Sequence, residues 1–170
     1  MSEVLQTSPQ QSLIVPAKTE KTREVLADTE QEGEGDLYAL PAKPSFDNPI
    51  AAIHHVADNY CCMKFETKDG AIGAHPASKH SFVRLAINPP ETAIALIKVW
   101  ISPDRIYGIQ LIGKDGTVLV AAGACKSEKL QEIPLEDGER LIGIRSRQLK
   151  NEYEYGTRHC KMVFVIGKME

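Results

Sequence analysis

The chain has 170 residues with a net charge of −3 and an isoelectric point near 6.0, and 42% of its residues are hydrophobic. This length holds one domain and an extension, and the apolar content is sufficient for a core. The acidic balance offers no basic face to nucleic acid. No apolar run approaches the roughly 20 residues that span a bilayer. We therefore expect neither a nucleic-acid partner nor a membrane partner.

The first 48 residues form a polar, proline-containing segment that we interpret as an N-terminal arm. Its apolar residues come in small groups, so the arm alone cannot bury enough surface to offset its ordering entropy. The composition from Thr19 to Gln31 fits one helix, capped by Thr19 and ended by Gly33 and Gly35. A solvated tail and an arm ordered mainly by a partner are both open. The apolar residues proposed as anchor points on a partner are Leu13, Ile14, Val15, Leu37 and Tyr38.

From residue 49 to residue 170 the sequence predicts an all-β domain. Short runs rich in β-branched and aromatic residues alternate with turn signals such as Lys68-Asp69-Gly70 and Lys114-Asp115-Gly116. The expected strands are residues 60–66, 81–87, 92–101, 105–112, 117–121, 130–135, 140–147 and 159–166. Residues 50–56 fit either a strand or a helical turn. About ten strands at this spacing indicate a sandwich, a barrel or a prism.

The expected strands also form an internal repeat. The matching segments are 65–70 with 111–116, 82–87 with 130–135, and 91–96 with 139–144. These pairs give a period of about 46 to 48 residues. A third, partial copy begins at residues 162–168, which match residues 109–114. The alternative is a chance likeness between strands that are joined by Asp-Gly turns.

At these residues the chain resembles the jacalin-like lectin domain, a β-prism of three Greek-key units. The resemblance covers about residues 60–168 and rests on Ile97-Lys-Val-Trp-Ile101, residues 105–116 and Glu139-Arg-Leu-Ile-Gly-Ile-Arg145. It implies an all-β, prism-like fold with an internal repeat, preceded by the extended arm, and a β-sandwich is the alternative. The third unit stops early, so its missing strands would come from elsewhere, for example from residues 37–40.

The resemblance also implies where a sugar would bind. In that family a Gly-x-x-x-Asp loop near the C-terminal strands holds sugar hydroxyls with a carboxylate and backbone amides. In this chain Gly143 is followed by Ile-Arg-Ser-Arg147, and Gly156 by Thr-Arg-His-Cys160, so neither segment has the aspartate. Carbohydrate is therefore a partner that the loop motif does not support, and a carbohydrate-binding module stays an alternative.

The chemically reactive residues lack the spacing of a catalytic or metal site. The histidines at 54–55 and the cysteines at 61–62 are adjacent pairs, whereas structural zinc ligands are separated by a few residues. We read the four cysteines as reduced thiols of an intracellular protein. A small cysteine-dependent enzyme would need, for example, Cys125 to meet His75 or His80. We expect no catalytic residue, no metal and no cofactor.

The surface feature that points to a protein partner is a charged and aromatic excursion over residues 145–155. Tyrosine and arginine are enriched among interface hot spots, although a solvated loop is the alternative. The contact residues expected there are Arg145, Arg147, Tyr153 and Tyr155. The sequence thus favours a non-enzymatic interaction or structural subunit of a larger intracellular assembly. We expect a cytoplasmic location, with a cytoskeletal or ciliary (axonemal) assembly as the context.

Overall fold

The structure is a computed structural model that describes residues 19–30, 36–56, 59–73, 82–126, 129–151 and 156–170. These residues form eleven strands, and no helix occurs among them. The described residues thus include no helix that could span a membrane.

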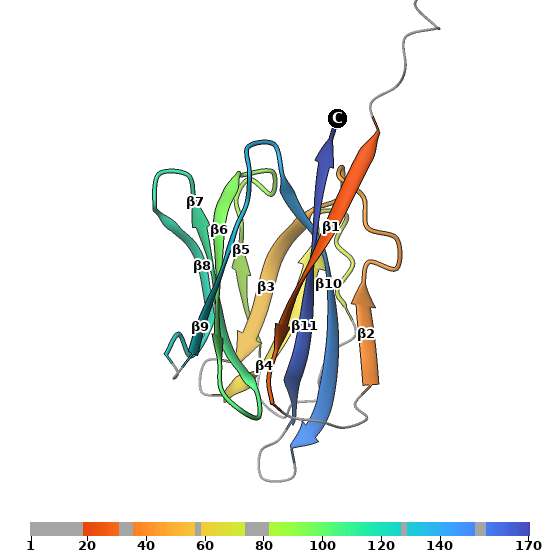
Figure 1. The fold of residues 1–170 in the computed structure, drawn as a ribbon. Helices are drawn as coiled ribbons and strands as arrows, with labels where there is room; N and C mark the ends of the chain where they lie inside the picture. Colours follow the sequence, from red (N-terminus) through yellow and green to blue (C-terminus); the bar gives the residue numbers. More distant parts are fainter. Residues whose placement is uncertain (1–18, 31–35, 57–58, 74–81, 127–128, 152–155) are drawn as a thin grey trace, which may run out of the picture.

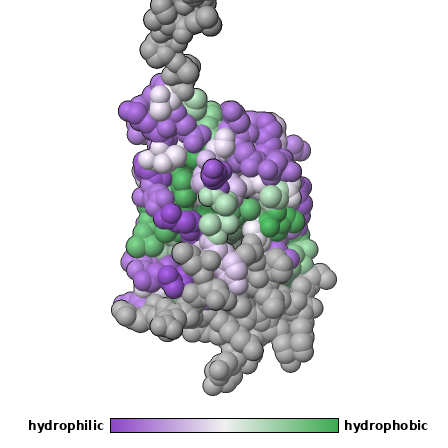
Figure 2. Space-filling view, turned by 90° about the vertical axis from the view of Figure 1, so that its right-hand side faces the viewer, coloured by the Kyte–Doolittle hydropathy of each residue, from purple (hydrophilic) through white to green (hydrophobic). Residues whose placement is uncertain are grey.

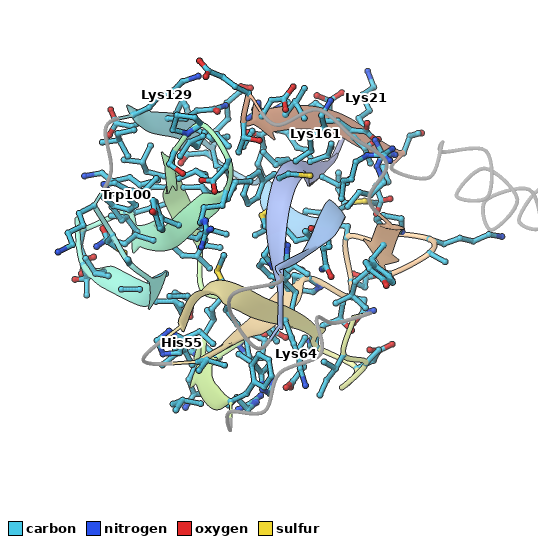
Figure 3. The ribbon with its side chains drawn as sticks, turned by 90° about the horizontal axis from the view of Figure 1, so that it is seen from below. Lys21, His55, Lys64, Trp100, Lys129 and Lys161 are labelled. Atoms are coloured by element: carbon cyan, nitrogen blue, oxygen red, sulfur yellow. The ribbon has the colours of Figure 1, made fainter. Side chains whose placement is uncertain are left out.

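The strands form three antiparallel sheets (Figure 1). Sheet A consists, in spatial order, of β1 (Glu20–Asp28), β11 (Gly156–Met169), β10 (Arg140–Asn151) and β2 (Asp36–Leu40). Sheet B consists of β4 (Asn59–Thr67), β3 (Ile50–Val56) and β5 (Val83–Ala86). Sheet C consists of β8 (Val118–Gly123), β7 (Ile106–Gly113), β6 (Ile94–Ile101) and β9 (Lys129–Pro134). The three sheets stand around one interior (Figure 3), so the predicted β-prism is confirmed and the sandwich alternative is wrong.

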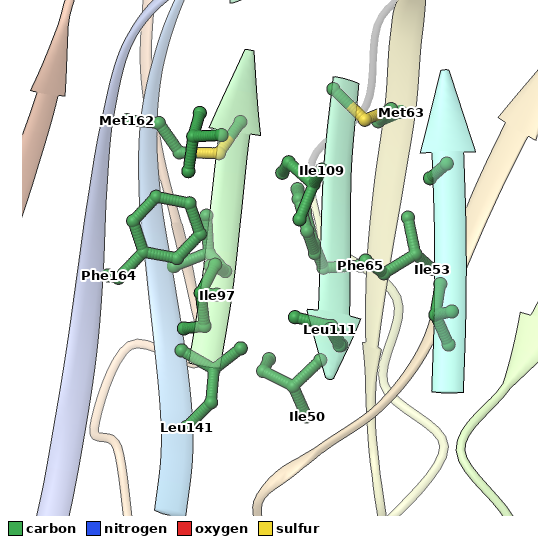
Figure 4. Packing of buried hydrophobic residues seen from close by; sticks show 14 of the residues in the cluster. Ile50, Ile53, Met63, Phe65, Ile97, Ile109, Leu111, Leu141, Met162 and Phe164 are labelled. Atoms are coloured by element: carbon green, nitrogen blue, oxygen red, sulfur yellow. The ribbon is translucent and has the colours of Figure 1, made fainter. Parts of the chain in front are cut away.

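The core fills the space between the three sheets. Along β6, Ile97 and Ile101 are buried, whereas Lys98 lies partly exposed on the other face. Successive strand residues point to opposite faces, so this alternation turns one apolar face inward. Figure 4 shows Phe164 of sheet A and Ile53 of sheet B among the side chains that meet there. Fully burying one such side chain stabilises the fold by roughly 1.5–3 kcal/mol.

The predicted internal repeat corresponds to equivalent strands in different sheets. The turn after β4, at Asp69-Gly70, is equivalent to the turn after β7, at Asp115-Gly116. Likewise β5 pairs with β3 as β9 pairs with β6, and the hairpin of β6 and β7 is equivalent to that of β10 and β11. In sheet B an isolated bridge joins Glu66 to Ile72, at the place where β8 pairs with β7 in sheet C. The repeat is therefore the prism's threefold architecture seen in the sequence.

The predicted helix from Thr19 to Gln31 is wrong, because its described residues form β1. This strand pairs with β11 from Glu20 opposite Met169 to Asp28 opposite Lys161, and β2 pairs with β10. Together β1 and β2 supply the outer strands of sheet A, as the prediction for residues 37–40 required. Pairing with a long neighbour outweighs the weak local preference for helix. The dependence of residues 1–18 on a partner stays a prediction, since they lie outside the described residues.

An ion pair between the partly exposed Arg23 and the nearly buried Glu139 joins β1 to the connection between β9 and β10. Arg23 donates from Nε to Glu139 Oε2 at 2.8 Å and from Nη2 to Glu139 Oε1 at 2.9 Å. The same Nη2 atom also donates to the Pro134 carbonyl oxygen at 2.9 Å. The Arg23 guanidinium holds the pKa of the Glu139 carboxyl below its usual value. These bonds join β1 to the connection between β9 and β10, so they fix the N-terminal strand in the fold.

Candidate functional site

The structure brings together two groups of predicted contact residues that are far apart in the sequence. On adjacent strands, Arg147 of β10 lies opposite Leu37 of β2, and Ser146 lies opposite Tyr38. Residues 13–15, Tyr153 and Tyr155 were also predicted to contact a partner, but they lie outside the described residues. Sheet A is therefore the part of the prism in which these sequence predictions converge.

The two arginines of this strand lie on the outer face of sheet A. Along β10 the neighbouring residues Ile144, Ser146 and Gln148 are buried, while Arg145 and Arg147 between them are only partly buried. Since strand residues alternate between faces, the arginines point away from the core. Tyr38, by contrast, pairs with the buried Ser146, and both residues line a small pocket between sheets A and B. The predicted contact residues therefore do not all belong to one surface.

The outer face of sheet A contains a groove of about 380 Å³, which we call the sheet-A groove. Its lining consists of Thr22, Glu24, Ala39, Leu40, Pro41, Ala42, Lys43, Pro44, Ile144, Arg145 and Val165. These residues come from all four strands of sheet A and from the segment after β2. Figure 2 views the molecule from the side of β2 and shows apolar residues at mid-height, with hydrophilic residues above them.

The groove forms because the segment after β2 packs against the outer face of the sheet and makes one of its walls. Pro44 lies over Gly143, where an added Cβ would come within 3.1 Å of Pro44 Cγ and 3.2 Å of the Leu40 carbonyl oxygen. Glycine therefore permits the close approach that seats this segment. Val165 points to the outer face of sheet A, yet only 5% of it is exposed. The groove accordingly has an apolar floor between a proline-containing wall and β1.

Polar and charged groups surround that floor. Arg145 donates from Nη2 to Glu24 Oε1, which joins β10 to β1 across the intervening strand β11. The hydroxyl-bearing Thr22 and the exposed Lys43 also line the groove. The arrangement thus combines hydrogen-bond donors, hydrogen-bond acceptors and an apolar surface within one depression.

A second polar cluster lies inside the prism, between sheets A and B. Ser146 Oγ is 2.5 Å from His159 Nδ1, and His159 Nε2 is 3.2 Å from the Met63 carbonyl oxygen. Burial lowers the pKa of His159 to about 4. The adjoining cavity of about 10 Å³ has no room for a substrate. This serine–histidine pair therefore stabilises the interior and is not a candidate catalytic site.

Other histidines tie strands together near the surface. His55 (Figure 3) accepts a hydrogen bond at Nδ1 from the Gly123 amide at 3.0 Å, which links sheet B to sheet C. His54 Nε2 is 2.8 Å from Glu66 Oε1, and Glu66 also accepts from Arg84. Among the described residues no group of three histidine, cysteine or acidic side chains could hold a metal ion.

Sequence reasoning found Arg145 but missed other residues of the groove, among them Glu24, Lys43 and Val165. Glu24 was assigned to a helix, and Lys43 lies between prolines that read only as loop signals. Val165 resembles any apolar strand residue in the sequence. The sequence does not show that it points to the outer face, where the segment after β2 forms the groove. The two segments compared with the family's sugar loop begin at Gly143 within β10 and at Gly156 at the start of β11, and residues 152–155 between these strands lie outside the described residues.

Comparison with known proteins finds solved structures with a similar fold but no match by sequence. No family description and no curated protein sequence matches this chain. The solved structure of artocarpin complexed with methyl-α-mannose matches with a TM-score of 0.60 and 10% identity, over 85% of this chain and 97% of artocarpin. A prostate-specific WGA16 glycoprotein lectin matches with a TM-score of 0.55 and 12% identity, over 84% of this chain and 97% of the lectin.

The biofilm matrix protein Bap1 of V. cholerae also matches, with a TM-score of 0.51 and 13% identity. That match covers 85% of this chain and 26% of Bap1. The identities are low, so the likeness concerns the fold. The chain has the β-prism fold of jacalin-like lectins.

Proposed function

We propose that this chain is a non-enzymatic carbohydrate-binding module that holds a saccharide in the sheet-A groove. The observation that carries the proposal is the shared fold with artocarpin, a protein solved with methyl-α-mannose, over 85% of this chain. Fold alone does not determine function, so the proposal also needs a site with suitable chemistry.

The groove has the features that saccharide binding requires. A sugar presents hydroxyl groups, which need donors and acceptors, and it presents C–H faces, which need an apolar surface. Glu24 supplies acceptors, Arg145 supplies donors, and Thr22 can do both. Val165 and Pro44 supply apolar surface. A volume of about 380 Å³ is at the small end of the range typical of small-molecule pockets.

Docking to another protein is the second candidate function. The observation that favours it is the pairing of Arg147 with Leu37 on neighbouring strands of sheet A, beside Arg145 on the outer face. Leu26 of β1 is 50% exposed in the same sheet and would add apolar contact area. In this case the prism would serve as a subunit of an assembly, and the groove would receive a side chain of the partner.

The test is binding of the full chain to a glycan array, followed by calorimetry on the glycans that bind. We expect binding by the wild-type protein and a loss of about tenfold or more in Arg145→Ala, because a charged hydrogen-bond donor is removed. Lys126→Ala is the matched control, since it removes one exposed positive charge on the segment after β8 in sheet C. If no glycan binds, the proposed function is wrong.

A further inference from the structure

We propose that the sheet-A groove selects an acidic saccharide, one that bears a carboxylate, and that Lys43 determines this specificity. The inference rests on the proposed saccharide-binding function and adds the chemical class of the ligand. It concerns the lateral face of sheet A, formed by β1, β11, β10, β2 and the segment after β2.

The charge of the groove is opposite to that of the whole chain. The chain has a net charge of −3, whereas the charged side chains that line the groove are two cations, Lys43 and Arg145, and one anion, Glu24. Glu24 pairs with Arg145. Lys43 has no ion pair or hydrogen bond with any residue in the described ranges, so an anionic ligand would meet no competing side chain at its ammonium.

Lys43 is held at the edge of the groove. It stands on a short segment with Pro41 before it and Pro44 after it, and proline fixes one backbone angle at each of these positions. Pro44 is in addition seated on Gly143, as the close approach of its Cγ shows. The lysine backbone is therefore restricted, so a ligand that meets the ammonium does not also have to order this segment of the chain.

Arg145 can share the negative charge of such a ligand. Its guanidinium has five N–H donors in a planar fork, and among the described residues Glu24 is the one side chain to which it donates. The remaining donors suit a carboxylate, whose hydrogen bonds with charged donors are about twice as strong as neutral ones. The Glu24 carboxylate accepts hydrogen bonds and therefore suits sugar hydroxyls beside the charged group.

The apolar floor favours a saccharide over an acidic peptide side chain. A glutamate side chain would bring a carboxylate but only a short, flexible apolar stem. A pyranose ring can place a C–H face on Pro41 and Pro44, beside the small exposed part of Val165, and Thr22 and Glu24 line the same groove for its hydroxyls. The uronic acids, sugars whose C6 is a carboxylate, combine all three kinds of contact.

The experiment compares matched pairs of ligands on the full chain by NMR titration. Each pair consists of a methyl glycoside of glucose, galactose or mannose and its uronate, which differ only at C6. We expect at least one uronate to bind about tenfold more tightly than its neutral partner at low ionic strength, with this preference reduced in high salt. In Lys43→Gln the preference should fall to within about twofold, whereas Lys126→Gln should retain it.

The outcomes separate the two proposals. Equal affinity for neutral glycosides and uronates, or a preference that survives in Lys43→Gln, would overturn the acidic-saccharide inference and leave the binding module standing. Absence of binding by every glycoside would overturn the acidic-saccharide inference, and the glycan array would then decide separately whether the binding module stands. N-acetyl-glutamate amide serves as the peptide control, and if it binds as tightly as the uronates, the ligand class is peptide and the inference is wrong.

Discussion

Ser146 of β10 and His159 of β11 meet inside the prism, with Ser146 Oγ 2.5 Å from His159 Nδ1. On the other side of the ring, His159 Nε2 lies 3.2 Å from the Met63 carbonyl oxygen of β4. A carbonyl only accepts, so Nε2 carries the hydrogen and Nδ1 accepts from the serine hydroxyl. One neutral imidazole thereby joins sheet A to sheet B.

This contact predicts that the protein loses stability in mild acid. Burial lowers the pKa of His159 to about 4 from an ordinary value of 6.5. Between these values the unfolded chain binds a proton that the folded chain does not, so the free energy of unfolding falls as pH falls. The full effect is about 3 kcal/mol. Urea denaturation at pH 7 and at pH 4.5 measures most of it.

The matched variant for this prediction is His159→Gln, which removes the titrating group. Its unfolding free energy should be lower at pH 7 but should depend less on pH than that of the wild type. His55 also has a pKa lowered by burial and adds a change of the same sign in both proteins. Equal pH dependence in wild type and variant would show that His159 is not the titrating group.

A second prediction concerns Glu66, whose pKa is lowered to about 2 mainly by its hydrogen bonds to Arg84, with a smaller share from His54. A lowered carboxyl pKa stabilises the fold above the ordinary value of 4.5, and this stabilisation is lost as pH falls toward 2. In Arg84→Leu we expect the pKa of Glu66 to rise clearly, and in His54→Gln to rise less. NMR titration of the Glu66 carboxyl measures both, and a larger rise in His54→Gln would contradict the assignment.

A third prediction distinguishes two glycines that share a backbone conformation. Gly116 has φ of +85° with open space around it, whereas Gly123 has φ of +74° and an added Cβ would overlap the Tyr107 carbonyl oxygen. Gly116→Ala should therefore cost about 1 kcal/mol of unfolding free energy, from backbone strain alone. Gly123→Ala should cost about 3 kcal/mol or more, because a backbone atom must also move. Urea denaturation of both variants would contradict this account if their costs were equal.

A fourth prediction tests whether β1 is an integral strand of the prism. Arg23→Ala would leave the nearly buried Glu139 carboxylate without its guanidinium partner, and we expect a loss of about 2 kcal/mol of unfolding free energy. Lys21→Ala, on the same strand, removes an exposed pair with Glu170 and should change little. Denaturation of the two variants measures the difference. Similar effects would show that the Arg23 contacts do not hold β1 in place.

The sequence was sufficient for much of the fold, for identifiable physical reasons. Apolar residues that alternate with more polar ones, as around Ile97 and Ile101, indicate half-buried strands. Asp69-Gly70 and Asp115-Gly116 indicate the turns between strands. The same signals repeated at a fixed period, so the equivalence of strands in different sheets was visible. By contrast, β1 was misread as a helix, since its polar residues are exposed on an outer strand and its identity depends on pairing with β11.

The groove was less accessible to sequence reasoning, because a groove depends on how separate segments approach one another. Arg145 was identified from its residue type and its neighbours. The closeness of Glu24 to Arg145 follows only from the pairing of β1, β11 and β10. The seating of Pro44 on Gly143 likewise follows from a segment that crosses the outer face of the sheet.

The most direct test of the account is to map a bound saccharide onto the labelled full chain by NMR. For a glycan that binds on the array, we predict the largest amide shifts at Thr22, Lys43, Arg145 and Val165. The amides of the other residues in sheet A should shift little. Shifts confined to sheets B and C, or no shift with any glycan, would contradict the claim that the sheet-A groove is a saccharide site.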